Sequence, residues 1–401
     1  MTAPRVPVPP RVGDPAALAR LVAALDSGGG ATRYIGGWVR DTLRGNMPQD
    51  IDIATRLPPE QALRAAKEAG LQVWSSASGL AHGTIGVVVG GKTIEVTTLR
   101  RDIATDGRHA EIAFTDDWRE DAARRDFTIN ALSADPLSGA VHDYFGGLAD
   151  LAAGCVRFIG DPETRIAEDH LRILRFFRFH ARFGQGAPHP PSYAACVARA
   201  RDLMALSRER IAGELLKLLA VADPVPAVTA MLAGGLFAPV LPEIVAADRL
   251  AALVAAERAA GTAPDGLRRL AALLPADGGI ADQVAARLRL SKVERKRLVL
   301  DADTAPASPE ALVYRLGAAA AVDRLLLLGR PDEAAHAAAW QPPRLPIGGG
   351  DLIAMGLSPG PAVARTLHAI EARWIEAGFP DAEAFDALVA VAVAQSLRER
   401  Q

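Results

Sequence analysis

Residues 34–54 read YIGGWVRDTLRGNMPQDIDIA, and this stretch contains the pattern that decides the fold. Short apolar runs lie at both of its ends, and a glycine pair separates the first run from a segment of helical composition. We expect strands over 33–35 and 50–54, connected by a tight turn and a short helix over 38–44. A strand, a helix and a second strand in close succession predict a mixed α/β unit.

Two aspartates, Asp50 and Asp52, lie near the end of this stretch and are separated by one residue. Because side chains alternate along a strand, both carboxylates are expected to point to the same face. Like charges held this close repel each other, and a bound cation relieves that repulsion. Mg²⁺ suits such a pair, since it binds one or two carboxylates and takes its other ligands from water and phosphates. The alternative interpretation is a solvated strand edge.

Upstream of the acids, Gly36 and Gly37 precede the short helix, and Arg40 follows one turn later. Glycine lets backbone amides approach a phosphate, a helix N-terminus favours negative charge, and a guanidinium adds a charged contact. A glycine pair alone is often only a turn. The ordered set of glycines, arginine and paired aspartates is far more specific, and it indicates a site for a nucleotide and its metal ions.

The segments that follow extend the mixed unit to about residue 150. We expect a helix over 59–69, a strand over 71–74 and a hairpin over 83–100. In the second strand of the hairpin, apolar and β-branched residues face one side and Glu95 points to the other. Glu95 is therefore a candidate metal ligand, and the alternative is a solvent-facing side chain.

The second part of the chain has a different composition and periodicity. A helix is expected over 162–183, and nearly everything beyond it has helical composition, with leucines at helical spacing in alanine-rich segments. The predicted fold class is therefore α+β, with a small mixed sheet and flanking helices followed by an all-α region.

The composition limits the class of protein. With 401 residues, the chain is expected to form more than one domain. The two cysteines, Cys155 and Cys196, form no disulfide framework or metal-ligand cluster, which favours reduced core residues in a cytoplasmic protein. No signal peptide and no apolar run of about 20 residues is found, so no membrane segment is expected. Because the net charge is −2, any RNA site must be a local basic surface.

Five stretches resemble, in order, those of the class II (bacterial-type) CCA-adding tRNA nucleotidyltransferases and the related bacterial poly(A) polymerases. They are IGGWVRDTLRG…DIDIA, EVTTLRRD, EDAARRDFTINAL, HDYFGGLADL…RFIGDPETRIAEDHLRILRFFRF and SRERIAGELLKLL, within about residues 33–219. The resemblance implies addition of CCA to tRNA 3′ ends from CTP and ATP, with two divalent ions, expected to be Mg²⁺. Nothing in the sequence points to an obligate protein partner.

The resemblance also implies the parts of the molecule and their roles. After an N-terminal segment (1–30) come a catalytic head (31–150), a neck (151–222), a helical body (223–300) and a tail that binds tRNA (301–401). Asp50 and Asp52 are the implied metal ligands, and the strand pattern adds Glu95 as a catalytic candidate. The nucleotide-binding residues are Gly36 from the turn pattern and, by resemblance, Gly37, Arg40, Arg125, Asp126, Asp169, Arg172, Arg175 and Arg178.

The helix expected over 162–183 suggests how a base is chosen. Asp169 and Arg172 are three residues apart, so both can reach one ligand edge. A carboxylate only accepts hydrogen bonds and a guanidinium only donates them, which matches the amino group and ring nitrogen of cytosine and adenine. Uracil and guanine present the reverse pattern. We therefore hypothesise that this pair selects CTP and ATP, and the alternative is a solvated basic helix face.

Several motifs allow a structural interpretation. Arg125 and Asp126 are also consistent with a buried ion pair that fixes a turn, and Arg210 and Glu214 are expected to form structural ion pairs. The polar loop over 100–114, with Gly107 at its tip, is a candidate mobile element. Family members that add only CC tend to lack such a loop. His142-Asp143 lacks the further ligands that a phosphohydrolase requires.

Two metal ions roughly 3.5–4 Å apart would stabilise the attacking and leaving oxygens of an in-line displacement at the α-phosphate. Positioning and charge neutralisation then suffice, and no protein nucleophile is needed. Three alternatives to CCA addition stay open: poly(A) synthesis, partial addition of CC or A alone, and a non-catalytic RNA-binding protein built on an inactive transferase.

Overall fold

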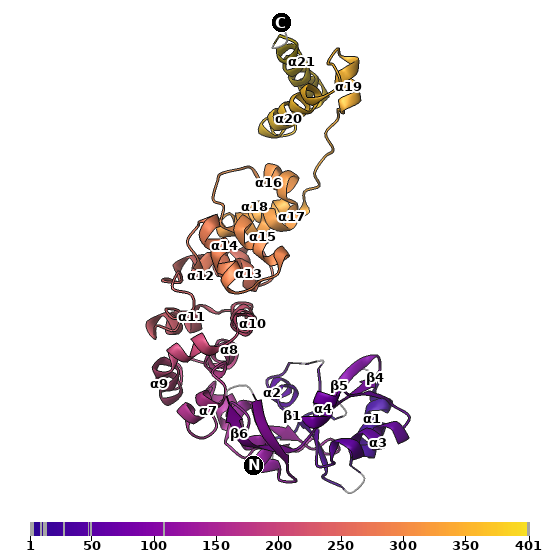
Figure 1. The fold of residues 1–401 in the computed structure, drawn as a ribbon, viewed down its shortest axis with the longest axis vertical. Helices are drawn as coiled ribbons and strands as arrows, with labels where there is room; N and C mark the ends of the chain where they lie inside the picture. Colours follow the sequence, from indigo (N-terminus) through magenta and orange to yellow (C-terminus); the bar gives the residue numbers. More distant parts are fainter. Residues whose placement is uncertain are drawn as a thin grey trace. The chain divides into compact units, whose positions relative to one another are not determined.

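The computed structural model describes residues 4–8, 10, 14–26, 29–46, 48, 50–106 and 109–398. The chain forms two compact units, Met1–Pro242 and Glu243–Gln401, and each is described by itself (Figure 1). The first unit contains a mixed sheet and the second is helical, which confirms the predicted α+β class. Among the described residues, no helix is both long and apolar enough to span a membrane. The finer division into head, neck, body and tail boundaries stays a prediction.

A seven-stranded sheet forms the centre of the first unit, with the spatial order β3-β4-β5-β2-β1-β8-β9. Strand β2 pairs with β5 in parallel, and the other neighbouring strands pair antiparallel. The strands are β1 (Thr32–Ile35), β2 (Asp52–Thr55), β3 (Gln72–Trp74), β4 (Thr84–Val89), β5 (Lys92–Thr98), β8 (Ser133–Ala134) and β9 (Val141–His142). The predicted hairpin is confirmed as β4–β5, whereas the strand predicted over 50–54 begins only at Asp52.

Helices surround the sheet, and the first of them was not predicted. In α1 (Pro15–Leu25), Asp14 caps the helix by accepting the N–H groups of Ala16 and Ala17, and three leucines, Leu18, Leu21 and Leu25, are fully buried. The other helices of this part are α2 (Gly37–Leu43), α3 (Pro59–Glu68), α4 (Ala77–Ala81), α5 (Trp118–Ala123), the 3₁₀ turn η1 (Thr128–Asn130) and α6 (Gly147–Ala153).

The segment predicted as a polar loop over 100–114 is instead a two-stranded sheet. β6 (Arg100–Asp106) pairs antiparallel with β7 (His109–Phe114). Backbone N–H and C=O groups that would face solvent in a loop therefore form hydrogen bonds between the two strands. The predicted tip residue, Gly107, lies outside the described residues.

The helix predicted over 162–183 is two helices, α7 (Pro162–Glu168) and α8 (Arg172–Phe183). At the break, Asp169 has an extended backbone (φ −155°, ψ 106°), and its Oδ1 accepts the N–H of Leu171 at 3.1 Å. An aspartate that bonds a nearby backbone N–H competes with the helix, which explains the interruption. The first unit continues with α9 (Pro190–Ala198), the 3₁₀ helix η2 (Ala200–Ala205), α10 (Arg208–Leu219) and α11 (Val225–Ala233).

The second unit is built from helices packed on helices. An apolar cluster that includes Leu352, Ile370, Trp374 and Phe385 forms the core of its last three helices. Its helices are α12 (Asp248–Ala259), α13 (Gly266–Leu273), α14 (Gly278–Arg287), α15 (Lys292–Asp301), α16 (Pro309–Leu316), α17 (Ala318–Leu327), α18 (Pro331–Ala339), α19 (Gly349–Ala354), α20 (Pro361–Glu376) and α21 (Ala382–Arg398).

Candidate active site

A polar cavity of about 460 Å³ in the first unit brings together most of the predicted site residues. Of those residues, Asp50, Glu95 and Arg178 do not line it. Two lining residues, Asn130 and Phe179, were not predicted. The complete lining is Gly36, Gly37, Arg40, Asp52, Arg125, Asp126, Asn130, Asp169, Arg172, Arg175 and Phe179.

The acidic group lies where β2 and β5 run in parallel. Asp52 and Glu95 are register partners, so they lie side by side on neighbouring strands, and Asp50 precedes β2. Partial removal of the Asp52 carboxylate from water raises its pKa. The negative charges of Glu95 and Asp50 raise this pKa further, and the positive charge of Arg125 lowers it. A carboxylate that is electrostatically strained by two other acids is a suitable ligand for a divalent cation.

The small number of acidic side chains suits a metal ion that takes only part of its ligands from the protein. Among the described residues, no group of three or more His, Cys, Asp or Glu side chains is arranged to hold a metal ion alone. Mg²⁺ does not need such a group, because it usually keeps waters and takes substrate phosphates as ligands. An ion at this site would need further ligands from water or from a bound substrate.

The glycine turn shapes one wall of the cavity. Gly36 has φ 63°, and a Cβ at this position would lie 3.2 Å from Nη1 of Arg125, so both the backbone and the close approach require glycine. Arg40 is buried, and its guanidinium lies 4.3 Å from the ring centroid of Phe183. Its Nε donates to Asp41 at 2.8 Å and its Nη1 donates to Asn130. Arg40 is thus held in a fixed orientation.

Arg125 and Asp126 do not pair with each other, so the interpretation as a single buried ion pair is wrong. Arg125 donates to Asp121 at 3.1 Å, whereas Asp126 accepts from Arg175 at 2.6 and 2.8 Å and from Asn130 at 2.9 Å. Burial alone would raise the pKa of Asp126, but the charge of Arg175 and these hydrogen bonds hold it below its usual range. The two residues therefore link different elements to the same cavity.

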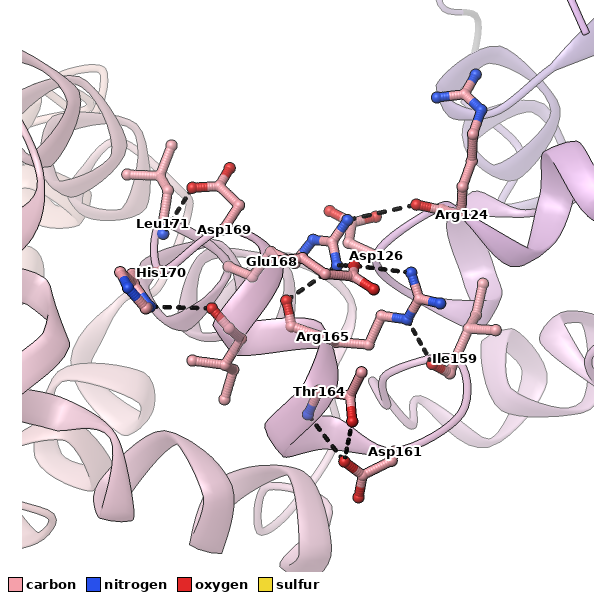
Figure 2. A network of polar contacts seen from close by, with 12 residues as sticks. Arg124, Asp126, Ile159, Asp161, Thr164, Arg165, Glu168, Asp169, His170 and Leu171 are labelled. Carbon is pink, nitrogen blue, oxygen red and sulfur yellow. Dashed lines mark hydrogen bonds and ion pairs between the residues drawn. The ribbon is translucent and has the colours of Figure 1, made fainter. Parts of the chain in front are cut away.

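Two arginines of α8, Arg172 and Arg178, are shielded from solvent, whereas Arg182 on the same helix is exposed. Side chains of Arg172 and Arg178 keep only 13% and 15% of their surface exposed. Arg172 donates to Glu168, to the carbonyl oxygen of Arg165 at 2.9 Å and to that of Arg124 at 3.3 Å. Figure 2 shows this region, where Leu171 donates to Asp169 at the helix break.

Residues of α10 support this group from the other side. Arg210 donates to both carboxylate oxygens of Asp169, and Glu214 accepts from Nε of Arg178 at 2.6 Å. The Arg178–Glu214 pair is an interhelical ion pair of the kind expected for this segment, whereas Arg210 contacts Asp169 at the helix break. Arg178 lines a separate basic cavity with Arg182 and Lys217.

The unpredicted residues had only weak signals. Asn130 belongs to the stretch RRDFTINAL, and Glu168 directly precedes Asp169, yet neither residue type alone indicates a role. The His142-Asp143 pair has a structural explanation, since Asp143 accepts the N–H groups of Gly147 and Leu148 at the start of α6.

Comparisons with known proteins agree with this geometry. Residues 32–157 match the family described as "Poly A polymerase head domain", and residues 187–248 match "Probable RNA and SrmB- binding site of polymerase A". The mitochondrial CCA tRNA nucleotidyltransferase 1 of Mus musculus is 34% identical over 365 residues, which cover 86% of this chain and 83% of the mouse protein. This chain belongs to the CCA tRNA nucleotidyltransferase family.

Two further relatives support the assignment to the CCA tRNA nucleotidyltransferase family. The Danio rerio protein of the same name is 46% identical over 189 residues, which cover 47% of this chain and 43% of the relative. That match therefore spans less than half of the zebrafish protein. The crystal structure of the Bacillus stearothermophilus CCA-adding enzyme in complex with CTP has a TM-score of 0.74 at 25% identity, and the match covers 96% of this chain and 98% of that one.

Proposed function

We propose that this chain adds CCA to the 3′ ends of tRNA, using CTP and ATP and releasing pyrophosphate. The observation that carries the proposal is the single cavity in which Asp52, the glycine turn and two arginines of α8, Arg172 and Arg175, meet. Membership of the CCA tRNA nucleotidyltransferase family supports it. Poly(A) synthesis, partial addition and non-catalytic RNA binding have less support, because the relatives that match along most of the chain carry CCA names.

Asp50 and Asp52 are the proposed ligands of two Mg²⁺ ions, with Glu95 as a further candidate beside Asp52. When bound, the ions would polarise the α-phosphate and stabilise the attacking 3′-hydroxyl oxygen and the leaving pyrophosphate. The role of the carboxylates is to hold these charges in place. Because the raised pKa of Asp52 arises partly from its acidic neighbours, cation binding is expected to lower that pKa.

The positive side chains of the cavity provide the complementary half of the site. Arg40 and Arg125 line the cavity with the glycine turn, which supports a role at the triphosphate. The Asp126–Arg175 pair lines the same cavity, which supports a role at the rest of the nucleotide. Asp169 and Arg172 lie in the same cavity and supply an acceptor and a donor for the base. Because Arg172 is already held by Glu168 and two carbonyl oxygens, its guanidinium is pre-oriented.

Purified protein, Mg²⁺, CTP, ATP and tRNA that ends at the discriminator base provide the test, with the product ends sequenced. Three added nucleotides in the order CCA support the proposal. Long adenosine tracts, CC alone or A alone would replace it with one of the alternatives, and no extension would contradict a catalytic role. The proposal includes a cytoplasmic location and the division into head, neck, body and tail at the predicted boundaries.

A further inference from the structure

Asn130 is an uncharged residue that contacts two oppositely charged side chains in the wall of the active-site cavity. It is the last residue of η1, is only 8% exposed and lines the cavity. Its Oδ1 accepts from Nη1 of Arg40, and its Nδ2 donates to Oδ1 of Asp126 at 2.9 Å. One side chain therefore connects a guanidinium of α2 with a carboxylate that precedes η1.

The charges of the two partners determine the orientation of this amide. A guanidinium offers only donors and a carboxylate only acceptors, so the amide oxygen must face Arg40 and the amide nitrogen must face Asp126. A rotation of the amide by half a turn would place donor against donor and acceptor against acceptor. Asn130 is thus held in one orientation, and in return it holds its two partners at a fixed separation.

Other residue types do not satisfy both partners at position 130. An aspartate would bring a second negative charge against Asp126, and a lysine or an arginine would repel Arg40. A serine hydroxyl can donate and accept, but its shorter side chain is not expected to reach both groups. Glutamine is one methylene longer, and added volume at a buried position is costly.

The two partners of Asn130 are also in contact with α8. Oδ2 of Asp126 accepts from Nε and Nη2 of Arg175 at 2.8 and 2.6 Å, and the guanidinium of Arg40 lies 4.3 Å from the ring centroid of Phe183. Guanidinium, amide, carboxylate and guanidinium therefore follow one another along the cavity wall. Arg40, Asp126 and Arg175 all line the cavity, so a change at Asn130 reaches charged groups of two helices.

We infer that Asn130 is a positioning residue, which fixes Arg40 and Asp126 in the orientations that bind the nucleotide. The inference rests on the proposed function, which places a nucleoside triphosphate in this cavity. Loss of the amide would leave a buried donor of Arg40 without its acceptor and would remove one donor from Asp126. Asp169 and Arg172 are held by other side chains, so the choice of base should not depend on Asn130.

Binding of CTP and of ATP to the full-length chain, with Mg²⁺ and without RNA, tests the inference by isothermal titration calorimetry. Asn130→Leu has a similar size and no polar group, and it should raise Kd for each nucleotide about tenfold. The ratio of kcat/KM for CTP to that for UTP should stay unchanged. Asn46→Leu, at an exposed position after α2 and outside the cavity, is the matched control and should bind like the unchanged chain.

A double-mutant cycle shows whether Asn130 acts through Arg40. Arg40→Met removes one of the two partners, so adding Asn130→Leu to it should raise Kd for CTP by a smaller factor than in the unchanged chain. Equal factors in the two backgrounds would overturn the inference, because the two residues would then act independently of each other.

Thermal melting separates positioning from a merely structural role. A lower melting temperature of Asn130→Leu with an unchanged Kd for CTP would overturn the inference. Asn130→Ser decides the matter if the leucine variant unfolds, since it should also weaken CTP binding, and an unchanged Kd would again contradict the positioning role. If the unchanged chain adds no CCA but Asn130→Leu still weakens CTP binding, the proposed function fails and the positioning role stands.

Discussion

Arg210 donates through Nη2 to both carboxylate oxygens of Asp169, at 3.0 and 2.8 Å. Asp169 lies at the break between α7 and α8, where the backbone is extended and no helix fixes the side chain. Arg210 belongs to α10, a regular helix that packs against α8. The orientation of the proposed base acceptor therefore depends on a residue that is distant in sequence.

Replacement of Arg210 by Met should reduce nucleotide selectivity more than stability. Without the guanidinium, Asp169 samples more orientations, and we expect the ratio of kcat/KM for CTP to that for UTP to fall about tenfold. Arg210→Lys should retain part of the ratio, because it keeps the charge but lacks the planar, rigid guanidinium. Arg201→Met, at an exposed position of η2, is the control. An unchanged CTP/UTP ratio in Arg210→Met would show that Asp169 needs no positioning.

Removal of either member of the proposed base-reading pair should have a larger effect. Asp169→Ala and Arg172→Ala are expected to reduce the preference for CTP and ATP over UTP and GTP by about 100-fold. Arg201→Gln offers a comparison, since Arg201 is an exposed arginine of η2 outside the cavity. Competition assays with all four nucleotides measure the preference. Retained selectivity in both alanine variants would refute the base-reading hypothesis.

The catalytic half of the site was predictable because its signals are local. The glycine pair, Arg40 and the two aspartates lie within one short stretch, and strand and turn rules place them on neighbouring elements. Glu95 was singled out as an acid in a β-branched strand, and the parallel pairing puts it beside Asp52. Strand boundaries were less accurate, since Asp50 falls just outside β2.

The second half of the site depends on contacts between segments that are far apart in sequence. Asp126 pairs with Arg175 of α8 rather than with its neighbour Arg125, and no local pattern distinguishes these partners. The break at Asp169 was missed because the apolar periodicity continues across it, while one side-chain-to-backbone hydrogen bond interrupts the helix. The partner of Asp126 and the position of the helix break therefore depend on specific hydrogen bonds that the apolar periodicity of the sequence does not reveal.

Asp52→Asn should greatly reduce catalysis without lowering the stability of the fold. Loss of the metal-binding charge is expected to lower kcat at least about 1000-fold. The melting temperature should stay the same or rise, because the substitution removes repulsion from Glu95 and Asp50. Glu95→Gln should raise the Mg²⁺ concentration for half-maximal activity, because it removes a candidate ligand and a negative charge beside Asp52. Full activity in Asp52→Asn would be incompatible with the proposed metal site.

A buried acid in the second unit makes stability depend on pH. Asp301 is 2% exposed, and neither of its carboxylate oxygens has a hydrogen-bond partner. Burial and the charges of Asp323 and Asp265 raise its pKa from 3.8 to about 7, against the opposing charges of Arg297 and Arg268. Because the folded state holds the proton more tightly than the unfolded state, this contribution to stability is complete below about pH 4 and is lost as pH rises to about 7.

Asp301→Asn should therefore stabilise the protein at pH 8 by about 1–3 kcal/mol, since an uncharged side chain replaces an unpaired buried charge. The gain should shrink as the pH falls towards 4, because protonation then neutralises the native aspartate as well. Urea unfolding of the second unit across this pH range measures the difference, with the exposed Asp386→Asn as control. A difference in unfolding free energy that does not vary with pH would mean that Asp301 keeps its charge in the folded state.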